Sequence, residues 1–288
     1  MSKITRISKS NVLQLIVGII FISGFFYACN PEKKLAKEFV YAPNKRNALV
    51  ITPDFLYKIN QKTWLLDSIK GSFTEEQKDS ILWELSDYVK NIDDSIFLAK
   101  FTAGYNYRLA KYGFDVFTPL TTNMFMERDS DSYIINIPQM ELEETIYPYK
   151  DETMLNGYTY FHQHYLNAID VSTWFEINKV NDTIMNQQTM FASDLITDNL
   201  SGTFDYNENT DQLKYYYKID TLKVKQIYDL AIELGKRYAE YTYDYLLNKY
   251  ILINKEQDDT LQYYWHYDID RNKIYPIWDN ENRLIPVD

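Results

Sequence analysis

The chain has 288 residues, of which 45% are hydrophobic, 25% are charged and 16% are aromatic, the last because it contains 27 tyrosines. This composition is that of an ordinary globular protein. It excludes a wholly disordered chain, a collagen and a small disulfide-stapled protein. The formal net charge of −11 argues against a nucleic-acid partner, because neutralising phosphates requires clustered lysine and arginine.

The N-terminal residues have the pattern of an export signal. A basic start without acidic residues is followed by the apolar stretch Val12–Tyr27, and then by Ala28 and Cys29, the only cysteine in the chain. This pattern predicts a signal peptide over residues 1–28. A cysteine directly after a small residue resembles the lipobox of bacterial lipoproteins, which implies lipid attachment at Cys29. The alternative is an uncleaved membrane anchor, since the apolar stretch can just span a bilayer.

The residues after Cys29 predict a location and a linker. The lipoprotein resemblance implies a protein anchored in the outer membrane. The run Asn-Pro-Glu-Lys-Lys lacks the acidic residues that usually follow the cysteine in surface-displayed lipoproteins of the Bacteroidetes, which favours a periplasm-facing protein. Residues 29–46 are polar, contain two prolines and are interpreted as a tether. Residues 47–288 show no repeat and no break in composition, so we expect a single periplasmic domain.

The first elements of this domain predict a crossover unit. Asn47–Thr52 is a short β-rich run, and Thr74 with Gln77 forms a capping box that opens a helix. A second helix is expected over Ser95–Tyr112, and Phe114–Phe117 reads as the next strand. A strand, a helical stretch and a strand usually place the two strands parallel.

The remaining elements are mostly antiparallel strands followed by a long helix. Strands are expected over Ser132–Ile137 and Met140–Tyr147, with Pro138 marking an edge or a bulge. Four further features complete the chain: a hairpin of Ala168–Val180 and Thr183–Leu195, a strand over Leu213–Ile219, a helix from Thr221 to about Ile251, and a strand pair over Leu261–Tyr267 and Lys273–Trp278. In the helix, small residues four apart (Ala231, Gly235 and Ala239) predict close packing against a sheet, and residues 254–288 are expected to fold back across it.

These elements predict an α+β fold, an α/β sandwich with a mixed, largely antiparallel sheet and two or three helices packed on it. The order of elements resembles the α/β domain of periplasmic assembly lipoproteins such as the curli secretion lipoprotein and the N-terminal domain of the Tol propeller protein. Three segments are also similar to those of uncharacterised Bacteroidetes lipoproteins: Leu49–Leu56, Met140–Glu144 and Tyr243–Tyr250. The resemblance implies a role in the cell envelope, and it carries no enzyme activity over to this chain.

The search for catalytic and metal-binding motifs finds weak patterns only. His162 and His164 are two residues apart, so on a strand they face the same way and could share a metal with Glu141, Glu143 or Glu144. The favoured interpretation is a polar stripe beside Tyr158, Tyr160 and Tyr165, because H-x-H alone is a weak signal. Glu141 and Glu143 could also be an acid and base pair, but such spacing is typical of a solvated strand face. We therefore predict no catalytic residue, no metal and no cofactor.

Three tyrosine-rich stretches are candidates for binding. They are Tyr215–Tyr217, Tyr238–Tyr250 and Tyr263–Tyr267. Tyrosine is favoured at protein interfaces and on sugar-binding platforms, and the alternative is a core rich in tyrosine. The leading hypothesis is a non-enzymatic, lipid-anchored protein that binds or scaffolds an envelope protein partner, in outer-membrane assembly or maintenance. The alternative is a glycan-binding lipoprotein of a nutrient-uptake system.

A recurring tripeptide predicts modification. Asp followed by Ser or Thr and an aliphatic residue occurs six times in the chain. The pattern resembles the O-glycosylation sequon of exported Bacteroidetes proteins, although Asp-Ser and Asp-Thr also form caps and turns. Thr183 and Thr260 are the candidate acceptors, because both lie near expected turns.

Overall fold

The computed structural model describes residues 30–43, 45–69, 71–128, 131–180, 188–255, 260–278 and 283–287. The chain divides into two compact units: unit 1 comprises Met1–Pro43 and Asp244–Asp279, and unit 2 comprises Asn44–Tyr243 and Asn280–Asp288. The single domain expected over 47–288 stays a prediction. The predicted signal peptide, residues 1–28, and Cys29 lie outside the described residues.

Unit 2 is built on a seven-stranded mixed sheet in the order β11-β6-β5-β4-β1-β3, with β2 paired to β4. Its strands are β1 (Arg46–Ile51), β2 (Tyr57–Asn60), β3 (Phe114–Phe117), β4 (Ser132–Leu155), β5 (Tyr158–Lys179), β6 (Thr189–Thr197) and β11 (Ile285–Val287). The pairs β1–β3, β1–β4 and β2–β4 are parallel, and β4, β5, β6 and β11 are antiparallel neighbours. The predicted α+β fold with a mixed sheet is confirmed.

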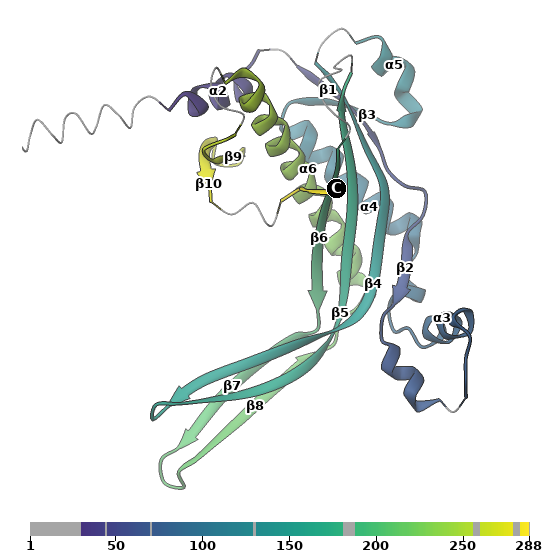
Figure 1. Ribbon diagram of the computed structural model, residues 1–288, viewed down its shortest axis with the longest axis vertical. Helices are drawn as coiled ribbons and strands as arrows, with labels where there is room; N and C mark the ends of the chain where they lie inside the picture. Colours follow the sequence, from purple (N-terminus) through teal and green to yellow (C-terminus); the bar gives the residue numbers. More distant parts are fainter. Residues whose placement is uncertain are drawn as a thin grey trace, which may run out of the picture. The chain divides into compact units, whose positions relative to one another are not determined.

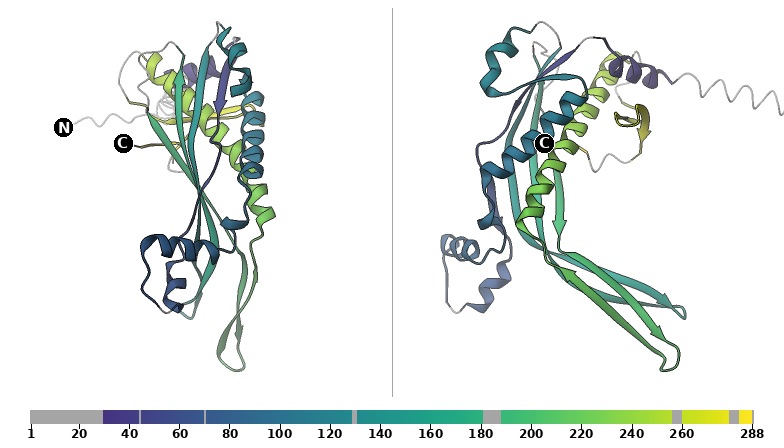
Figure 2. Two further views of the ribbon diagram at one scale, coloured as in Figure 1. Left: turned by 90° about the vertical axis from the view of Figure 1, so that its right-hand side faces the viewer. Right: turned by 180° about the vertical axis from the view of Figure 1, so that it is seen from behind.

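The helices of unit 2 lie mostly where their caps and periodicity predict. They are α3 (Glu75–Glu84), α4 (Asp94–Lys111), α5 (Thr122–Met126) and the part of α6 (Val224–Asn254) up to Tyr243, with three short 3-10 helices, η1 (Thr63–Ser68), η2 (Val89–Asn91) and η3 (Pro119–Thr121). The capping box of α3 is present, because Gln77 N donates to Thr74 Oγ1 and Thr74 N donates to Gln77 Oε1. Figure 2 shows α4 and α6 on the same face of the sheet.

The core of unit 2 lies between this sheet and the helices α4 and α6. Phe175 of β5 is fully buried, with its ring centroid 6.4 Å from Tyr105 of α4 and 5.6 Å from Tyr238 of α6. The two helices approach closely, since a Cβ on Gly235 would lie 2.1 Å from the carbonyl oxygen of Phe101. The prediction that Gly235 brings α6 close to a sheet is wrong: this glycine meets the backbone of α4, because the helices pack on each other as well as on the strands.

One irregularity in the sheet was predicted from sequence. The ladder between β4 and β5 shifts register between Asn136 and Gln139, around Pro138. Proline has no N–H to donate, so it is tolerated inside a sheet at a bulge. Of the two alternatives, edge or bulge, the structure shows the bulge, since β4 lies between β1 and β5.

Unit 1 contains a helix where a tether was predicted. Within residues 29–46, Pro31–Val40 form α2, whose first turn is capped by the Asn30 side chain accepting from Glu32 N at 2.9 Å. Glu32 is buried and accepts hydrogen bonds from Trp265 Nε1 at 3.0 Å and Lys255 Nζ at 2.8 Å. The polar segment is therefore ordered, because its one buried carboxylate is fully partnered within unit 1.

The C-terminal strand pair completes unit 1. The predicted strands appear as β9 (Tyr264–Asp268) and β10 (Lys273–Ile277), an antiparallel pair. Strand β9 lies against the C-terminal part of α6, where Trp265 N donates to Asn248 Oδ1 at 2.8 Å and His266 Nδ1 lies 2.7 Å from Asp244 Oδ2. The expected folding back of the chain after α6 is thus confirmed in this unit.

Candidate functional site

A two-layered projection of unit 2 is the most distinctive feature of the described chain. We call it the arm, and it consists of residues 147–166 of the β4–β5 hairpin together with residues 199–220, the hairpin of β7 (Asn199–Asn207) and β8 (Gln212–Asp220). Figure 1 shows both hairpins extending beyond the rest of the sheet. The pairing of β5 with β6 ends at Ala168, whereas its pairing with β4 continues to the tip at Leu155 and Tyr158.

The tip of the first hairpin is set by a local sequence signal. Asn156 and Gly157 have φ angles of 52° and 80°. Both residues of a tight turn between twisted strands need positive φ, which Asn-Gly adopts most readily. This dipeptide could have predicted the β4–β5 hairpin from sequence, and the sequence analysis missed it.

One carboxylate fixes both ends of the second hairpin to β5. Asp198 precedes β7, and its Oδ2 accepts from the backbone and side-chain nitrogens of Asn167, each at 2.9 Å. Its Oδ1 accepts from Leu222 N at 2.8 Å, just after β8. The amide oxygen of Asn167 in turn accepts from the buried Lys62 Nζ at 2.9 Å. We call this point of attachment at Asn167, Asp198 and Leu222 the root of the arm, and the rest of unit 2 outside the arm its body. These hydrogen bonds tie the root rigidly to the body.

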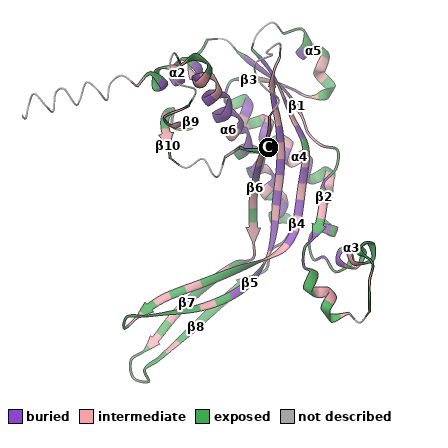
Figure 3. Cartoon of the chain, viewed as in Figure 1, coloured by how far each residue is buried: buried purple, intermediate pink, exposed green. Residues whose placement is uncertain are grey.

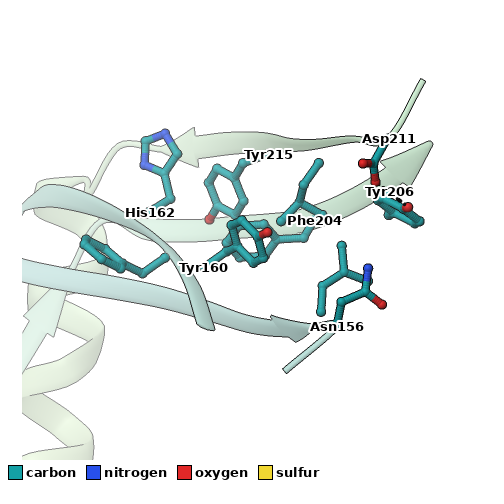
Figure 4. Close-up of a pocket in the computed structure, with 10 residues that line it drawn as sticks. Asn156, Tyr160, His162, Phe204, Tyr206, Asp211 and Tyr215 are labelled. Carbon is teal, nitrogen blue, oxygen red and sulfur yellow. Dashed lines mark hydrogen bonds between the residues drawn. The ribbon is translucent and has the colours of Figure 1, made fainter. Parts of the chain in front are cut away.

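Aromatic and histidine side chains face each other across the two layers. The rings of His162 and His164 on β5 are stacked, with centroids 4.6 Å apart and planes at 7°. Tyr215 of β8 lies 4.6 Å from His162, and Tyr217 lies 4.4 Å from His164. Figure 4 shows His162, Tyr160, Phe204 and Tyr215 pointing into the space between the hairpins. The two layers are thus joined by ring contacts.

A half-buried polar contact crosses the same space. The Tyr215 hydroxyl donates to Asp151 Oδ2 of β4 at 2.9 Å. Gly202 on β7 leaves room for this contact, since a Cβ there would lie 1.8 Å from the Tyr215 oxygen. Burial, together with the hydrogen bond to Asp151, raises the pKa of Tyr215 to about 12, so the hydroxyl keeps its proton at neutral pH.

His164 is held in its neutral form. Its side chain is only 7% exposed, and its Nε2 has no hydrogen-bond partner among the described residues. Burial lowers the pKa of His164, and the neighbouring His162 lowers it further, while Asp151 acts in the opposite direction. A second proton on this ring would be desolvated and close to another imidazole, so the packed arm favours the neutral ring.

A pocket opens between the layers toward the tip of the arm. Its volume is about 440 Å³, and its lining includes Asn156, Tyr160, Phe204, Tyr206 and Asp211. The Tyr206 hydroxyl donates to Asp211 Oδ1 at 2.8 Å. This lining combines aromatic faces with a few polar groups, and that combination is typical of pockets that bind a ligand.

The outward faces of the arm expose large apolar side chains. Met154 is 75% exposed, Tyr165 is 68% exposed and Phe161 is 61% exposed. Figure 3 shows that this region is mostly exposed or intermediate, in contrast to the buried strands of the body. Grouped exposed aromatics are typical of interaction surfaces.

The three tyrosine-rich stretches separate into two kinds. Tyr216 and Tyr217 of the first stretch are each more than half exposed on the arm. Tyr238 and Tyr243 of the second stretch are buried, and so is Trp265 within the third. Those three side chains belong to buried aromatic cores, whereas the tyrosines of the first stretch are candidates for binding on the arm.

The alternative metal site does not assemble around the two histidines. The pairing places Asp151 opposite His162 and Tyr149 opposite His164, while Glu143 lies opposite Asp170, farther along the ladder. No group of three metal-binding side chains forms within the part of the chain that the structure describes. The two histidines do share one side of a strand, as the sequence predicts, but Glu141, Glu143 and Glu144 do not join them.

The three glutamates have other surroundings. Glu144 is buried, and Lys62 Nζ lies 2.8 Å from its Oε1, while Ser86 Oγ and Tyr88 N donate to its Oε2. Burial alone raises its pKa, but these hydrogen bonds outweigh burial and hold the pKa of Glu144 below its usual value. Glu143 lies opposite Asp170, whose pKa is raised by burial and then by Glu143. Glu141 accepts from Gln139 Nε2.

The modification sites stay predictions. Cys29 and Thr183 lie outside the described residues. Thr260 is described and exposed, and its carbonyl oxygen accepts from Lys255 Nζ at 3.1 Å. Residues that sequence reasoning missed are Asp198, Asn167 and Asp151, whose roles depend on contacts between strands distant in the chain.

Two comparisons with known proteins were negative. No protein-family model matches the chain, and no curated protein is similar to it. None of the helices in the described ranges has the length and apolar character needed to span a membrane.

Proposed function

We propose that this protein is a non-enzymatic binding protein of the bacterial envelope, which is anchored by lipid at Cys29 and uses the arm to hold a protein partner. It faces the periplasm from the outer membrane and acts in assembly or maintenance of that membrane. The observation that carries the proposal is the arm itself, a projection with exposed aromatic side chains and a rigid root.

The arm has the character of a recognition element. Exposed Tyr165 and Phe161 give it large aromatic side chains of the kind enriched in the centres of protein interfaces. Its root is fixed through Asn167 and Asp198, so little order has to be gained when a partner binds. Rigid projections with aromatic anchors lose less entropy on association than flexible loops do.

Anchoring is tested at the cysteine. The substitution Cys29→Ser removes the thiol that would carry the lipid, so we expect no incorporation of labelled fatty acid and an uncleaved precursor. Gel mobility and mass spectrometry of the N-terminus measure both effects. Wild-type protein that carries no lipid, or that retains residues 1–28, contradicts the anchor.

Partner binding is tested by photo-crosslinking in living cells. The photoreactive p-benzoylphenylalanine replaces Tyr165 on the arm or, as a control, Leu120 of η3, which is 96% exposed. We expect one discrete crosslinked protein from position 165 and none from position 120. The identified protein is then purified, and its affinity for the wild-type chain and for Tyr165→Ser is measured. Absence of a crosslink from the arm contradicts the proposal.

Glycan binding is the second candidate, because the pocket between the layers has a lining suited to sugars. Tyr160 and Phe204 offer aromatic faces, and Asp211 with Asn156 offers polar groups at the same opening. A glycan array tests it with the wild-type chain and with Phe204→Ala. Saturable sugar binding that this variant loses favours the uptake role over the protein-binding role.

A further inference from the structure

One strand edge of the arm lacks the usual protection against pairing. Strand β5 keeps β4 on one side along its whole length, but β6 pairs with it only over Ala168–Glu176. Over Tyr158–Leu166 the other side of β5 has no strand partner among the described residues. We call this segment the open edge.

Strand β6 does not extend along the open edge. Beyond Thr197 the chain is diverted at Asp198, whose N–H donates to the carbonyl of Asn167 at 2.9 Å. The following strand, β7, pairs with β8 in the facing layer. Since the side chain of Asp198 holds Asn167 and Leu222 at the same point, β6 cannot continue along β5.

The sequence of the open edge differs from that of the other strands of the arm. The segment reads Tyr-Thr-Tyr-Phe-His-Gln-His-Tyr-Leu and contains no proline, glycine, lysine or acidic residue. The arm part of β4 has Pro148, Lys150 and Glu152, β7 has Gly202 and Asp205, and β8 has Lys214 and Lys218. Proteins normally guard exposed edges with charges, prolines or irregularities, so an unguarded aromatic edge is a site for strand pairing.

We propose that the open edge binds an extended segment of a different protein, which adds a strand to β5. This inference rests on the proposed function, since it names how the arm holds its protein partner. In this mode the main-chain N–H and C=O groups supply affinity, and side chains at alternate positions supply specificity. The exposed Phe161 and Tyr165 flank such a strand on one face.

Charge decides what kind of strand fits. The arm has six acidic residues and three lysines, and the open edge itself contains none of them. A neutral or basic segment is therefore favoured, with apolar side chains at alternate positions. A second copy of this chain is disfavoured, because it brings an equally acidic arm and a net charge of −11.

A displayed library of random peptides, about ten residues long, tests the inference against the full chain in detergent, since strands of that length cover such an edge. We expect the selected peptides to alternate in hydrophobicity, to be neutral or basic, and to protect the amides of Tyr158–Leu166 from hydrogen exchange. Methylation of alternate peptide nitrogens removes donors, so we expect it to weaken binding about tenfold or more. Peptides that protect another region, or none selected above background, overturn the inference.

A pair of substitutions on neighbouring strands provides the control. Phe161→Lys places a charge on the open edge, and Met154→Lys places the same charge on β4, at another exposed position facing outward. We expect peptide affinity to fall about tenfold with the first and less than about twofold with the second, because only β5 borders the added strand. Equal effects of both overturn the inference, as does a dimer of the wild-type chain in sedimentation that Phe161→Lys abolishes.

The outcome can be separated from that of the proposed function. If the partner crosslinked at position 165 binds Phe161→Lys as tightly as the wild-type chain, the protein-binding function stands and strand addition is wrong. If no partner crosslinks to the arm, the function itself is wrong.

Discussion

The body and the arm of unit 2 share two strands but are held together by different means. In the body, Phe175 is fully enclosed between Tyr105 and Tyr238, and the strands are covered by two helices. In the arm, the only described element that covers the same strands is the β7–β8 hairpin, through ring contacts such as that between His162 and Tyr215. Because the arm buries far less apolar surface, its opening free energy is lower than that of the body. A partner can therefore act on the arm without disturbing the fold.

The largest expected effect is on the body. Phe175→Ala removes a fully buried ring and leaves a cavity between β5 and the helices α4 and α6, so we expect a loss of about 3–5 kcal/mol in the free energy of unfolding. Urea denaturation followed by circular dichroism measures it. The matched change on the arm, Phe161→Ala, removes a ring that is 61% exposed and should leave the unfolding midpoint nearly unchanged. Similar losses for both would show that arm and body unfold as one unit.

The second prediction concerns the buried ion pair beside the root of the arm. Lys62→Met leaves Glu144 without its cation, so we expect a loss of about 3 kcal/mol at neutral pH. In the wild-type chain the pKa of Glu144 is lowered, so the stability it contributes is present above its ordinary value of 4.5. That stability is lost as pH falls through the folded-state value. Unfolding curves at several pH values check both, and a variant as stable as wild type at pH 7 contradicts the role of Lys62.

The third prediction is a pH range in which only the arm responds. His164 is neutral in the packed arm with a lowered pKa, so the arm is fully stable above the ordinary value of 6.5. It loses stability as pH falls through that value toward the lowered one, because the open form takes up the proton. The protection factors of arm amides, which correct exchange rates for the intrinsic effect of pH, should therefore fall below about pH 6.5, while those of body amides stay high. His164→Phe keeps a ring and should remove this pH dependence; a fall that persists in the variant assigns it to other groups.

The smallest expected effect is on one hydrogen bond of the arm. Tyr215→Phe removes the donor to Asp151, so we expect about 1 kcal/mol less protection of arm amides and no change in the global unfolding midpoint. Tyr216→Phe, on the exposed side of β8, is the control and should have no effect. Gly202→Ala should reproduce the loss, because its methyl group would collide with the Tyr215 hydroxyl. A lower global midpoint for Tyr215→Phe would contradict the separation of arm and body.

Sequence patterns predicted the body better than the arm. Thr74 with Gln77, the bulge at Pro138 and the strand Phe114–Phe117 are local signals, and each lies where the sequence places it. The α2 helix was missed because its surface is polar, although Asn30 followed by Pro31 is a start signal for a helix. Its ordering depends on Glu32 meeting Trp265, far along the chain.

The arm could be predicted only in part. The side chains of His162 and His164 lie on the same face of β5, as the two-residue repeat of a β-strand predicts. That they face Tyr215 and Tyr217 depends on the diversion of the chain at Asp198, which no local pattern reveals. Strands in a narrow two-layered projection also have no fully buried face, so their alternation in hydrophobicity is weak. For this reason the long β4–β5 hairpin was expected only as far as Tyr147 and from Ala168.

The capped start of α2 sets how far the protein can stand from a bilayer. In a chain acylated at Cys29, only Asn30 and Pro31 separate the lipid-bearing residue from Glu32, which is locked into unit 1. Even fully extended, the segment from Cys29 to Glu32 spans about 10 Å at most, which is little more than the depth of one headgroup layer. Unit 1 would then contact the lipid surface directly. The exposed lysines of α2, such as Lys34 and Lys37, would lie close to anionic headgroups.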